Sequence, residues 1–122
     1  MRKDALNGKR LLIVEDEYLV ASDLSIILEG AGARVFGPVS DLERALEIAS
    51  TMQIGFDAAI LDINLNGEMA YPVATLLRES NFPFIFLTGY GYDAMPEQFR
   101  DAPCMLKPFE EERLVRLLAS IT

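Results

Sequence analysis

Short apolar runs alternate with helical patterns along the whole chain, and this alternation limits the possible folds more than any other feature. The runs have the length of buried strands, and the segments between them place apolar residues on one face of a helix. Strands that alternate with helices form βαβ units, in which helices cover both faces of a parallel sheet. The pattern predicts a doubly wound α/β fold with five strands and five helices.

The predicted strands occupy residues 11–14, 34–36, 58–61, 84–87 and 104–106. Apolar stripes predict helices that begin near Val20, Leu42, Val73 and Leu114, and a weaker helix over residues 93–100. Ser40 with Glu43 indicates a capping box at the start of the second helix. Residues 64–67 are expected to form a loop.

The composition excludes several classes of function. At 122 residues the chain has the length of one domain. Its net charge of −8 opposes binding to nucleic acid or to anionic membranes. The only cysteine is Cys104 and histidine is absent, which excludes an internal disulfide, multi-thiolate zinc sites and catalytic histidines. No apolar run approaches the roughly 20 residues of a membrane span, so we expect a cytoplasmic protein.

Polar residues stand where four of the predicted strands end. The first strand is followed by an acidic run, the third by one carboxylate, the fourth by a hydroxyl and the fifth by a lysine before a proline. The carboxyl ends of parallel strands meet at one edge of the sheet, so these side chains should converge there. They are Glu15, Asp16 and Glu17, then Asp62, Thr88, Lys107 and Pro108.

This set of residues suits magnesium-dependent phosphoryl transfer. Mg²⁺ commonly takes one or two carboxylates with water and phosphate oxygens, and Glu15, Asp16, Asp62 and the backbone carbonyl of Asn64 could supply ligands. A carboxylate can act as nucleophile and carry an aspartyl phosphate. The ion, the Lys107 ammonium, and the Thr88 hydroxyl or nearby amides would then each contact one phosphate oxygen.

The constellation resembles the receiver domain of two-component response regulators over nearly the whole chain. The matching stretches are residues 12–17, 61–65, 87–89 and 106–109, in this order and each at a predicted strand end. The resemblance implies a flavodoxin-like sheet with strand order 2-1-3-4-5 and Mg²⁺ or Mn²⁺ as cofactor. It implies that Asp62 is phosphorylated, Glu15 and Asp16 bind the metal, Thr88 is the switch hydroxyl, Lys107 binds phosphate, and the bond before Pro108 is cis.

The sequence departs from the usual receiver pattern at Cys104, where most members carry a switch aromatic. Residues 86–92 resemble a receiver subgroup, often stand-alone, that has a Phe-x-Thr-Gly-Tyr stretch and lacks this aromatic. We hypothesise that movement of the loop replaces the aromatic switch. The loop would hinge on Gly89 and Gly91 and carry Tyr90 or Tyr92. A bulky Tyr90 beside Asn64 should also slow the water that hydrolyses the aspartyl phosphate.

The resemblance leads to expectations about partners. The phosphodonor would be a sensor histidine kinase or a histidine phosphotransfer protein. The chain would be one receiver domain over residues 1–122 without an output domain, a monomer or weak dimer. Its output would be a contact with an unknown downstream protein, a relay step or a phosphate sink. We expect no enzymatic activity beyond self-phosphorylation and autodephosphorylation.

Two docking faces are possible. On the first predicted helix, Leu19, Ser22, Asp23 and Ile26 share one face, which would suit the phosphodonor unless Leu19 or Ile26 is simply buried. The other is the face formed by the fourth helix, the fifth strand and the fifth helix, where many receivers pair.

Other functions remain open at this point. One alternative is a pseudo-receiver that binds partners without phosphorylation. Another is a phosphate-ester hydrolase, but that class usually needs an acid two residues after the nucleophile, where this chain has Asn64. Each motif residue also has an ordinary reading as a helix-turn acid, a turn cap, a strand-end hydroxyl or a surface lysine.

Overall fold

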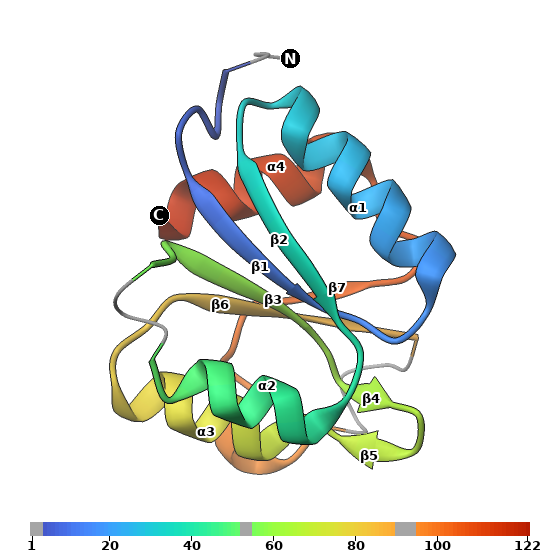
Figure 1. The fold of residues 1–122 in the computed structure, drawn as a ribbon, viewed down its shortest axis with the longest axis vertical. Helices are drawn as coiled ribbons and strands as arrows, with labels where there is room; N and C mark the ends of the chain where they lie inside the picture. The colour runs from blue at the N-terminus through green and yellow to red at the C-terminus, as the bar shows by residue number, and fades with distance from the viewer. Residues whose placement is uncertain (1–3, 52–54, 90–94) are drawn as a thin grey trace.

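The computed structural model of the chain describes residues 4–51, 55–89 and 95–122. Its main sheet has five parallel strands in the order β2-β1-β3-β6-β7 (Figure 1). Because β6 and β7 are the fourth and fifth strands predicted from the sequence, the predicted order 2-1-3-4-5 is confirmed. The strands are β1 (Arg10–Val14), β2 (Arg34–Val39), β3 (Ala58–Asp62), β6 (Phe84–Thr88) and β7 (Cys104–Leu106).

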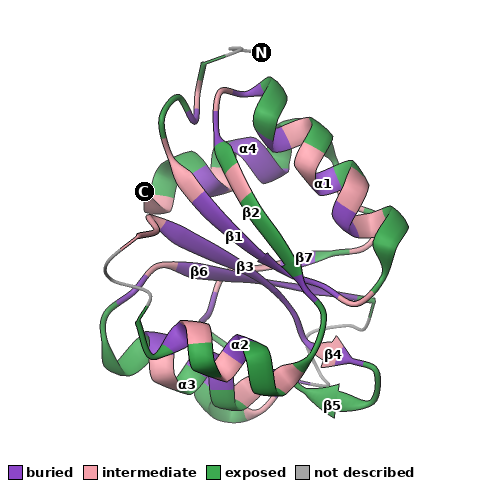
Figure 2. Ribbon diagram, viewed as in Figure 1, coloured by how far each residue is buried: buried purple, intermediate pink, exposed green. Residues whose placement is uncertain are grey.

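Helices cover both faces of this sheet (Figure 1). On one face lie α1 (Tyr18–Gly30) and α4 (Glu111–Ile121), and on the other lie α2 (Leu42–Ala49) and α3 (Tyr71–Glu79). The two faces have separate hydrophobic cores, which meet across the fully buried strands β3 and β6 (Figure 2). Strands buried on both faces account for apolar runs without a polar alternation.

Four aromatic rings fill the core on the α2 and α3 side. The Tyr71 ring stacks on Phe99 with centroids 5.5 Å apart, and Phe86 meets both rings edge-on at 6.0 and 5.6 Å. Phe84 packs against Phe86 at 5.3 Å. Cys104 lies opposite Phe86 in the neighbouring strand, so this thiol borders the aromatic core.

The second strand runs three residues further than predicted, through Gly37 and Pro38 to Val39. Proline lacks a backbone N–H and is tolerated in an edge strand such as β2, where its missing donor faces away from the ladder. Gly37 has a φ of +108°, and a Cβ at this position would lie 2.6 Å from the carbonyl oxygen of Ile13. Glycine is therefore required where β2 passes β1.

Two predictions about helices were wrong in detail. The N-cap of α2 is Asp41 rather than Ser40, and its Oδ1 accepts a 2.8 Å hydrogen bond from the backbone N–H of Arg44. Within the described part of residues 93–100, only Glu97–Phe99 is helical, as a 3₁₀ turn (η3) after Pro96, and residues 93 and 94 lie outside the described residues. Proline restrains the residue before it to extended backbone, which prevents a continuous helix here.

The segment predicted as a loop after β3 is a short antiparallel hairpin. Its strands β4 (Asn64–Leu65) and β5 (Glu68–Met69) project beside the carboxyl ends of the main sheet (Figure 1). Asn66 and Gly67 form the turn with φ values of 52° and 93°. Asn-Gly is the preferred pair where a tight hairpin needs positive φ at both central residues.

Among the described helices, none combines the length and the apolar character needed to cross a membrane.

Candidate functional site

The acidic residues of the sequence motif converge at the carboxyl ends of the two central strands. Glu15 follows β1 directly, Asp62 is the last residue of β3, and Val14 pairs with Leu61 between them. Both carboxylates are almost fully buried, with 1% and 5% of their residues' surface exposed. Together with half-buried Asp16 they place one carboxylate oxygen each within 4.8 Å of one another.

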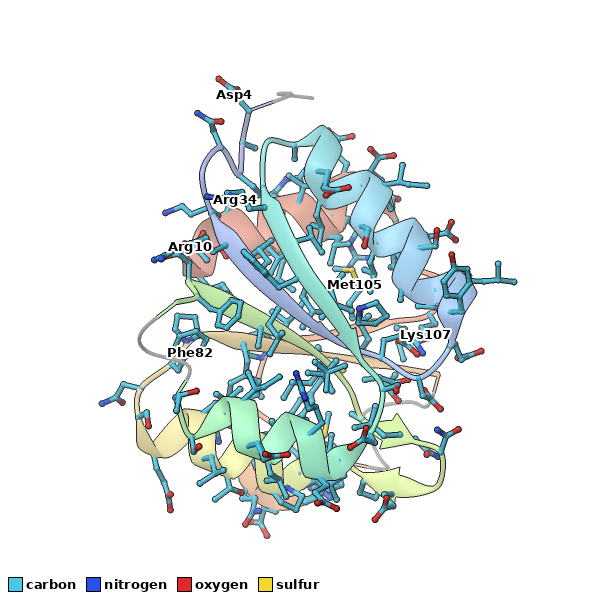
Figure 3. All side chains as sticks on the ribbon, viewed as in Figure 1. Asp4, Arg10, Arg34, Phe82, Met105 and Lys107 are labelled. Carbon is cyan, nitrogen blue, oxygen red and sulfur yellow. The ribbon has the colours of Figure 1, made fainter. Side chains whose placement is uncertain are left out.

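Lys107 is the cation of this cluster. It follows β7, and its peptide bond to Pro108 is cis. Its Nζ lies 3.1 Å from Asp62 Oδ2 and 3.2 Å from Glu15 Oε1. Nζ also lies 3.3 Å from Oε1 of Glu17, the exposed N-cap of α1. Figure 3 places Lys107 at the opposite end of the sheet from Arg10 and Phe82.

Burial and mutual repulsion dominate the electrostatics of the site. Burial, followed by the hydrogen bond and charge of Asp62, raises the pKa of Glu15 to about 8. Burial also acts to lower the pKa of Lys107, but the hydrogen bond and charge of Asp62 and the charge of Glu15 outweigh it and raise that pKa. Even with Glu15 protonated at neutral pH, the one ammonium is outnumbered by the acidic groups of Asp16, Glu17 and Asp62, so the site carries an excess of negative charge.

The residues present fit a divalent cation. The buried Oε1 of Glu15 accepts no hydrogen bond from the described residues, although it lies close to the Lys107 ammonium. A buried oxygen without a hydrogen bond, in a group of three carboxylates, is the environment in which a hard cation replaces missing donors. Glu15, Asp16 and Asp62 are the residues that would hold such an ion.

The β4–β5 hairpin closes the site on the side of Asp16. The backbone N–H of Asn66 donates to Asp16 Oδ2 at 2.9 Å. The backbone N–H of Asn64 donates to Asp62 Oδ1 at 3.2 Å, and the Asn64 side-chain oxygen accepts from Gly67 at 2.6 Å. The Asn64 side chain is therefore held within the hairpin, whereas a metal contact of its backbone carbonyl stays a prediction.

Thr88, which the resemblance predicts to be the switch residue, is joined to Lys107 through its backbone. Thr88 is buried at the end of β6, and its carbonyl accepts a 2.8 Å hydrogen bond from the Lys107 N–H. Gly89 lines the 390 Å³ cavity of the site with Asp16, Glu17, Asp62, Asn64 and Lys107. The predictions for Tyr90, Gly91 and Tyr92 fall outside the described residues.

Two contacts of the site were not predicted from the sequence. The salt bridge of Glu17 to Lys107 was missed, although Glu17 ends the acidic run that follows the first predicted strand. The hydrogen bond between the hairpin and Asp16 was missed as well, and the Asn-Gly pair at 66–67 is the signal that could have indicated the hairpin.

Comparison with known proteins agrees with this geometry. The response regulator receiver domain family matches residues 11–119. The chain therefore belongs to the response regulator receiver domain family.

Several relatives match most of this chain but differ in how much of their own length the match covers. The sensory transduction protein LytT of Bacillus cereus is 34% identical, over 89% of this chain and 45% of LytT. The regulator PhyR of Methylorubrum extorquens is 35% identical, over 82% of this chain and 38% of PhyR. The chain thus spans about half the length, or less, of these curated relatives. The solution structure of SdrG from Sphingomonas melonis is similar over 93% of this chain and 96% of SdrG, with 39% identity and a TM-score of 0.79.

Proposed function

We propose that this receiver accepts a phosphoryl group on Asp62 from a phosphohistidine of a sensor histidine kinase or a histidine phosphotransfer protein, with Mg²⁺ as cofactor. It signals through contacts with other proteins and has no catalytic activity beyond its own phosphorylation and dephosphorylation. The observation that carries the proposal is the buried cluster of Glu15, Asp62 and Lys107 at the carboxyl ends of β1, β3 and β7.

Each of the described site residues serves a particular step of the proposed transfer. An oxygen of Asp62 attacks phosphorus, the P–N bond of the donor breaks, and its imidazole leaves. The Asn64 N–H and the Lys107 ammonium, at 3.2 and 3.1 Å from the Asp62 oxygens, orient the carboxylate before attack. Lys107 then pairs with a phosphoryl oxygen. Glu15, Asp16 and Asp62 would hold the cation, which would neutralise charge on the phosphoryl group.

A solved relative supports the phosphorylated state. The BeF3-activated conformation of SdrG is similar to this chain over 95% of its length, with 37% identity and a TM-score of 0.76. Beryllofluoride resembles a phosphoryl group in shape and charge, so its activation of SdrG supports the proposal that this chain accepts a phosphoryl group.

The face of α1 is the proposed docking surface for the phosphodonor. Leu19 and Ile26 are 77% and 68% exposed, so neither side chain is explained by burial in the core. Beside them a 530 Å³ cavity between α1 and the segment after β7 is lined by Ile26, Phe109 and Lys107. A donor domain seated there would hold its histidine near Lys107, which contacts Asp62.

Intact-mass spectrometry after incubation with a small acyl phosphate and Mg²⁺ tests the phosphoacceptor. We expect one added phosphoryl group, which disappears without the metal and in Asp62→Ala. The matched control is Asp101→Ala, because Asp101 is an exposed aspartate away from the site and should leave the adduct unchanged. An adduct that persists in Asp62→Ala would contradict the proposal, as would a protein that neither forms an adduct nor binds Mg²⁺ in titration.

A kinase transfer assay tests the docking surface. Ile26→Asp should slow transfer from the phosphorylated donor protein, because a charge would face the apolar donor surface, and should leave labelling by the acyl phosphate unchanged. Glu29→Lys is a control for altered charge at another exposed position further along α1. Equal transfer rates to Ile26→Asp and to the unaltered protein would exclude this surface.

A further inference from the structure

The turn of the β4–β5 hairpin consists of a residue pair that can react on its own. Asn66 and Gly67 are both exposed, and a Cβ added at Gly67 would meet no atom within 4 Å. Asparagine is thermolabile, because the backbone nitrogen that follows it can attack its side-chain amide. Glycine has no side chain to hinder that attack. The turn therefore has the composition and the access to water that deamidation requires.

One hydrogen bond of the hairpin opposes this reaction. The Gly67 N–H donates to Oδ1 of Asn64 at 2.6 Å. The nitrogen must lose its proton before it can attack, and this bond stabilises the protonated amide and fixes its direction. Asn64 belongs to β4, where it pairs with Met69, so the hairpin itself positions the acceptor. The reactive pair and the group that restrains it thus lie in the same short element.

We propose that Asn66 is a site of spontaneous deamidation and that the Asn64 side chain controls its rate. The Gly67 nitrogen gives up its proton to water and attacks Cγ of Asn66. A succinimide ring closes as the bond between Cγ and Nδ2 breaks, and the leaving nitrogen takes up a proton and departs as ammonia. One water molecule then opens the ring at either carbonyl, so the product at this position is aspartate or isoaspartate.

A second Asn-Gly pair in the sequence provides an internal comparison. Asn7 and Gly8 are also exposed, and Gly8 has a φ of +76°. Here the glycine N–H donates to the backbone carbonyl of Gly32 at 3.0 Å. The two pairs share composition and exposure, but the acceptor at Gly67 is a side chain. A substitution can therefore remove the restraint at one pair and leave the other intact.

The same hairpin connects this reaction to the acidic cluster. The Asn66 N–H donates to Oδ2 of Asp16 at 2.9 Å, and Asp16 is one of the three carboxylates that would hold a cation. Isoaspartate adds one atom to the backbone, which a tight two-residue turn cannot absorb without moving. This part of the inference rests on the proposed function. We expect the isoaspartate form to bind Mg²⁺ about tenfold more weakly, because an outer contact of a ligand is lost.

The test follows both asparagines in one sample. The full chain is incubated at mildly alkaline pH below its unfolding temperature and then digested, and aspartate and isoaspartate are quantified separately at Asn66 and Asn7. Asn64→Ala should raise the rate at Asn66 about fivefold, the factor that one hydrogen bond supplies, and leave the rate at Asn7 unchanged. Asn64→Asp is the matched variant, because it keeps an acceptor and should keep the rate at Asn66 low.

Several results would overturn the proposal. Equal rates at Asn66 in Asn64→Ala and the unaltered protein, or equal rises in Asn64→Ala and Asn64→Asp, would show that the acceptor does not control the reaction. A rise by the same factor at Asn7 would assign the effect to loosening of the whole fold. Absence of both products at Asn66 in every variant would exclude deamidation there.

A second measurement tests the consequence for the cluster. The isoaspartate form is separated by ion exchange and titrated with Mg²⁺ beside the unaltered protein. Unchanged affinity, in a chain that binds Mg²⁺, would remove the link between the turn and Asp16. The rates of deamidation need neither Mg²⁺ nor phosphorylation, so a failure of the inference is distinguishable from a failure of Asp62 to accept a phosphoryl group.

Discussion

At the scale of single residues, Lys107 holds together groups that would otherwise repel one another. Its Nζ lies within 3.3 Å of oxygens from Glu15 and Glu17, in the segment between β1 and α1, and from Asp62 at the end of β3. Because the lysine is the only cation in contact with this cluster among the described residues, the arrangement stays electrostatically unbalanced without a further positive charge. A divalent cation would thus be attracted by the same contacts that position Asp62, the proposed phosphoacceptor.

Asp57 gives a prediction that concerns stability rather than signalling. Its Oδ2 accepts a 2.7 Å hydrogen bond from the Arg10 N–H and pairs with the guanidinium at 3.3 Å. These contacts lower the pKa of Asp57 below its ordinary value of 3.8. We expect Asp57→Ala to lower the free energy of unfolding at pH 7 by about 1 kcal/mol, allowing for its partial exposure.

The pH dependence of this effect has a definite sign. Because the pKa of the folded state is the lower one, the stabilisation is fully present above about pH 4 and is lost as the pH falls through the folded value. Urea unfolding at pH 7 and at pH 3 would measure it, and the gap between Asp57→Ala and the unaltered protein should narrow in acid. Asp101→Ala is the control. The Asp101 side chain, which pairs with Arg78, is 82% exposed, so its loss should change stability little at either pH. A gap that widens in acid would contradict the assignment.

Tyr90 lies outside the described residues, and the prediction for it rests on the sequence alone. A bulky side chain in the loop after Thr88 should hinder the water that attacks the aspartyl phosphate. We expect Tyr90→Ala to lose its phosphoryl group faster, measured as decay of the adduct by intact-mass spectrometry. Tyr18→Ala, an exposed tyrosine on α1, should decay at the unaltered rate. Equal rates of phosphoryl loss in both variants would show that Tyr90 does not shield the aspartyl phosphate from water.

At the scale of elements, the β4–β5 hairpin links the geometry of a turn to Asp16, one of the proposed metal ligands. Gly67 has a φ of 93°, and its N–H binds the Asn64 side chain. We expect Gly67→Ala to destabilise the fold by about 1 kcal/mol, because a Cβ disfavours this backbone conformation. The Asn66 N–H would no longer hold Asp16, and Mg²⁺ affinity should fall about tenfold, as it does when outer contacts of a ligand are lost.

Isothermal titration with Mg²⁺ and thermal unfolding would measure both effects. Gly30→Ala serves as the matched control, since Gly30 ends α1 in open space and without a positive φ. That variant should keep the metal affinity and change stability by less than about 0.5 kcal/mol. Unchanged Mg²⁺ affinity in Gly67→Ala would show that the hairpin does not position Asp16.

The elements also show what the sequence could and could not predict. The proximity of Asp62 and Lys107 could be predicted from the sequence, because the carboxyl ends of parallel strands meet at one edge whatever the details of packing. The partners of Asp16 could not, because that rule locates a residue without specifying which donor its oxygens accept. The cap of α2 was missed by one position, since Ser40 and Asp41 are both good N-caps and only the first helical residue distinguishes them.

At the scale of the whole molecule, a cation bound at the proposed site would stabilise the fold. The cluster joins β1, β3 and the segment after β7, so a cation that binds it binds only the folded state. At ten times the dissociation constant of Mg²⁺, mass action adds about 1.4 kcal/mol to the free energy of unfolding. For a chain of this length that corresponds to a rise in Tm of about 5 °C.

Differential scanning calorimetry with and without Mg²⁺ would measure this shift. The rise should vanish in Asp16→Asn and persist in Asp23→Asn, whose exposed carboxylate on α1 lies outside the cluster. A rise of equal size in both variants would mean that Mg²⁺ stabilises the acidic surface in general.

The two outer strands have a consequence for how this molecule can assemble. At one border of the sheet β2 contains Pro38 without a backbone donor, and at the other β7 is only three residues long. Short or proline-containing borders offer a poor template for a strand from another chain. Growth of the sheet by edge-to-edge addition is therefore suppressed at high concentration. Partner proteins would therefore bind the exposed side chains of the helices. Those side chains can change in evolution without altering the hydrogen bonds of the sheet beneath them.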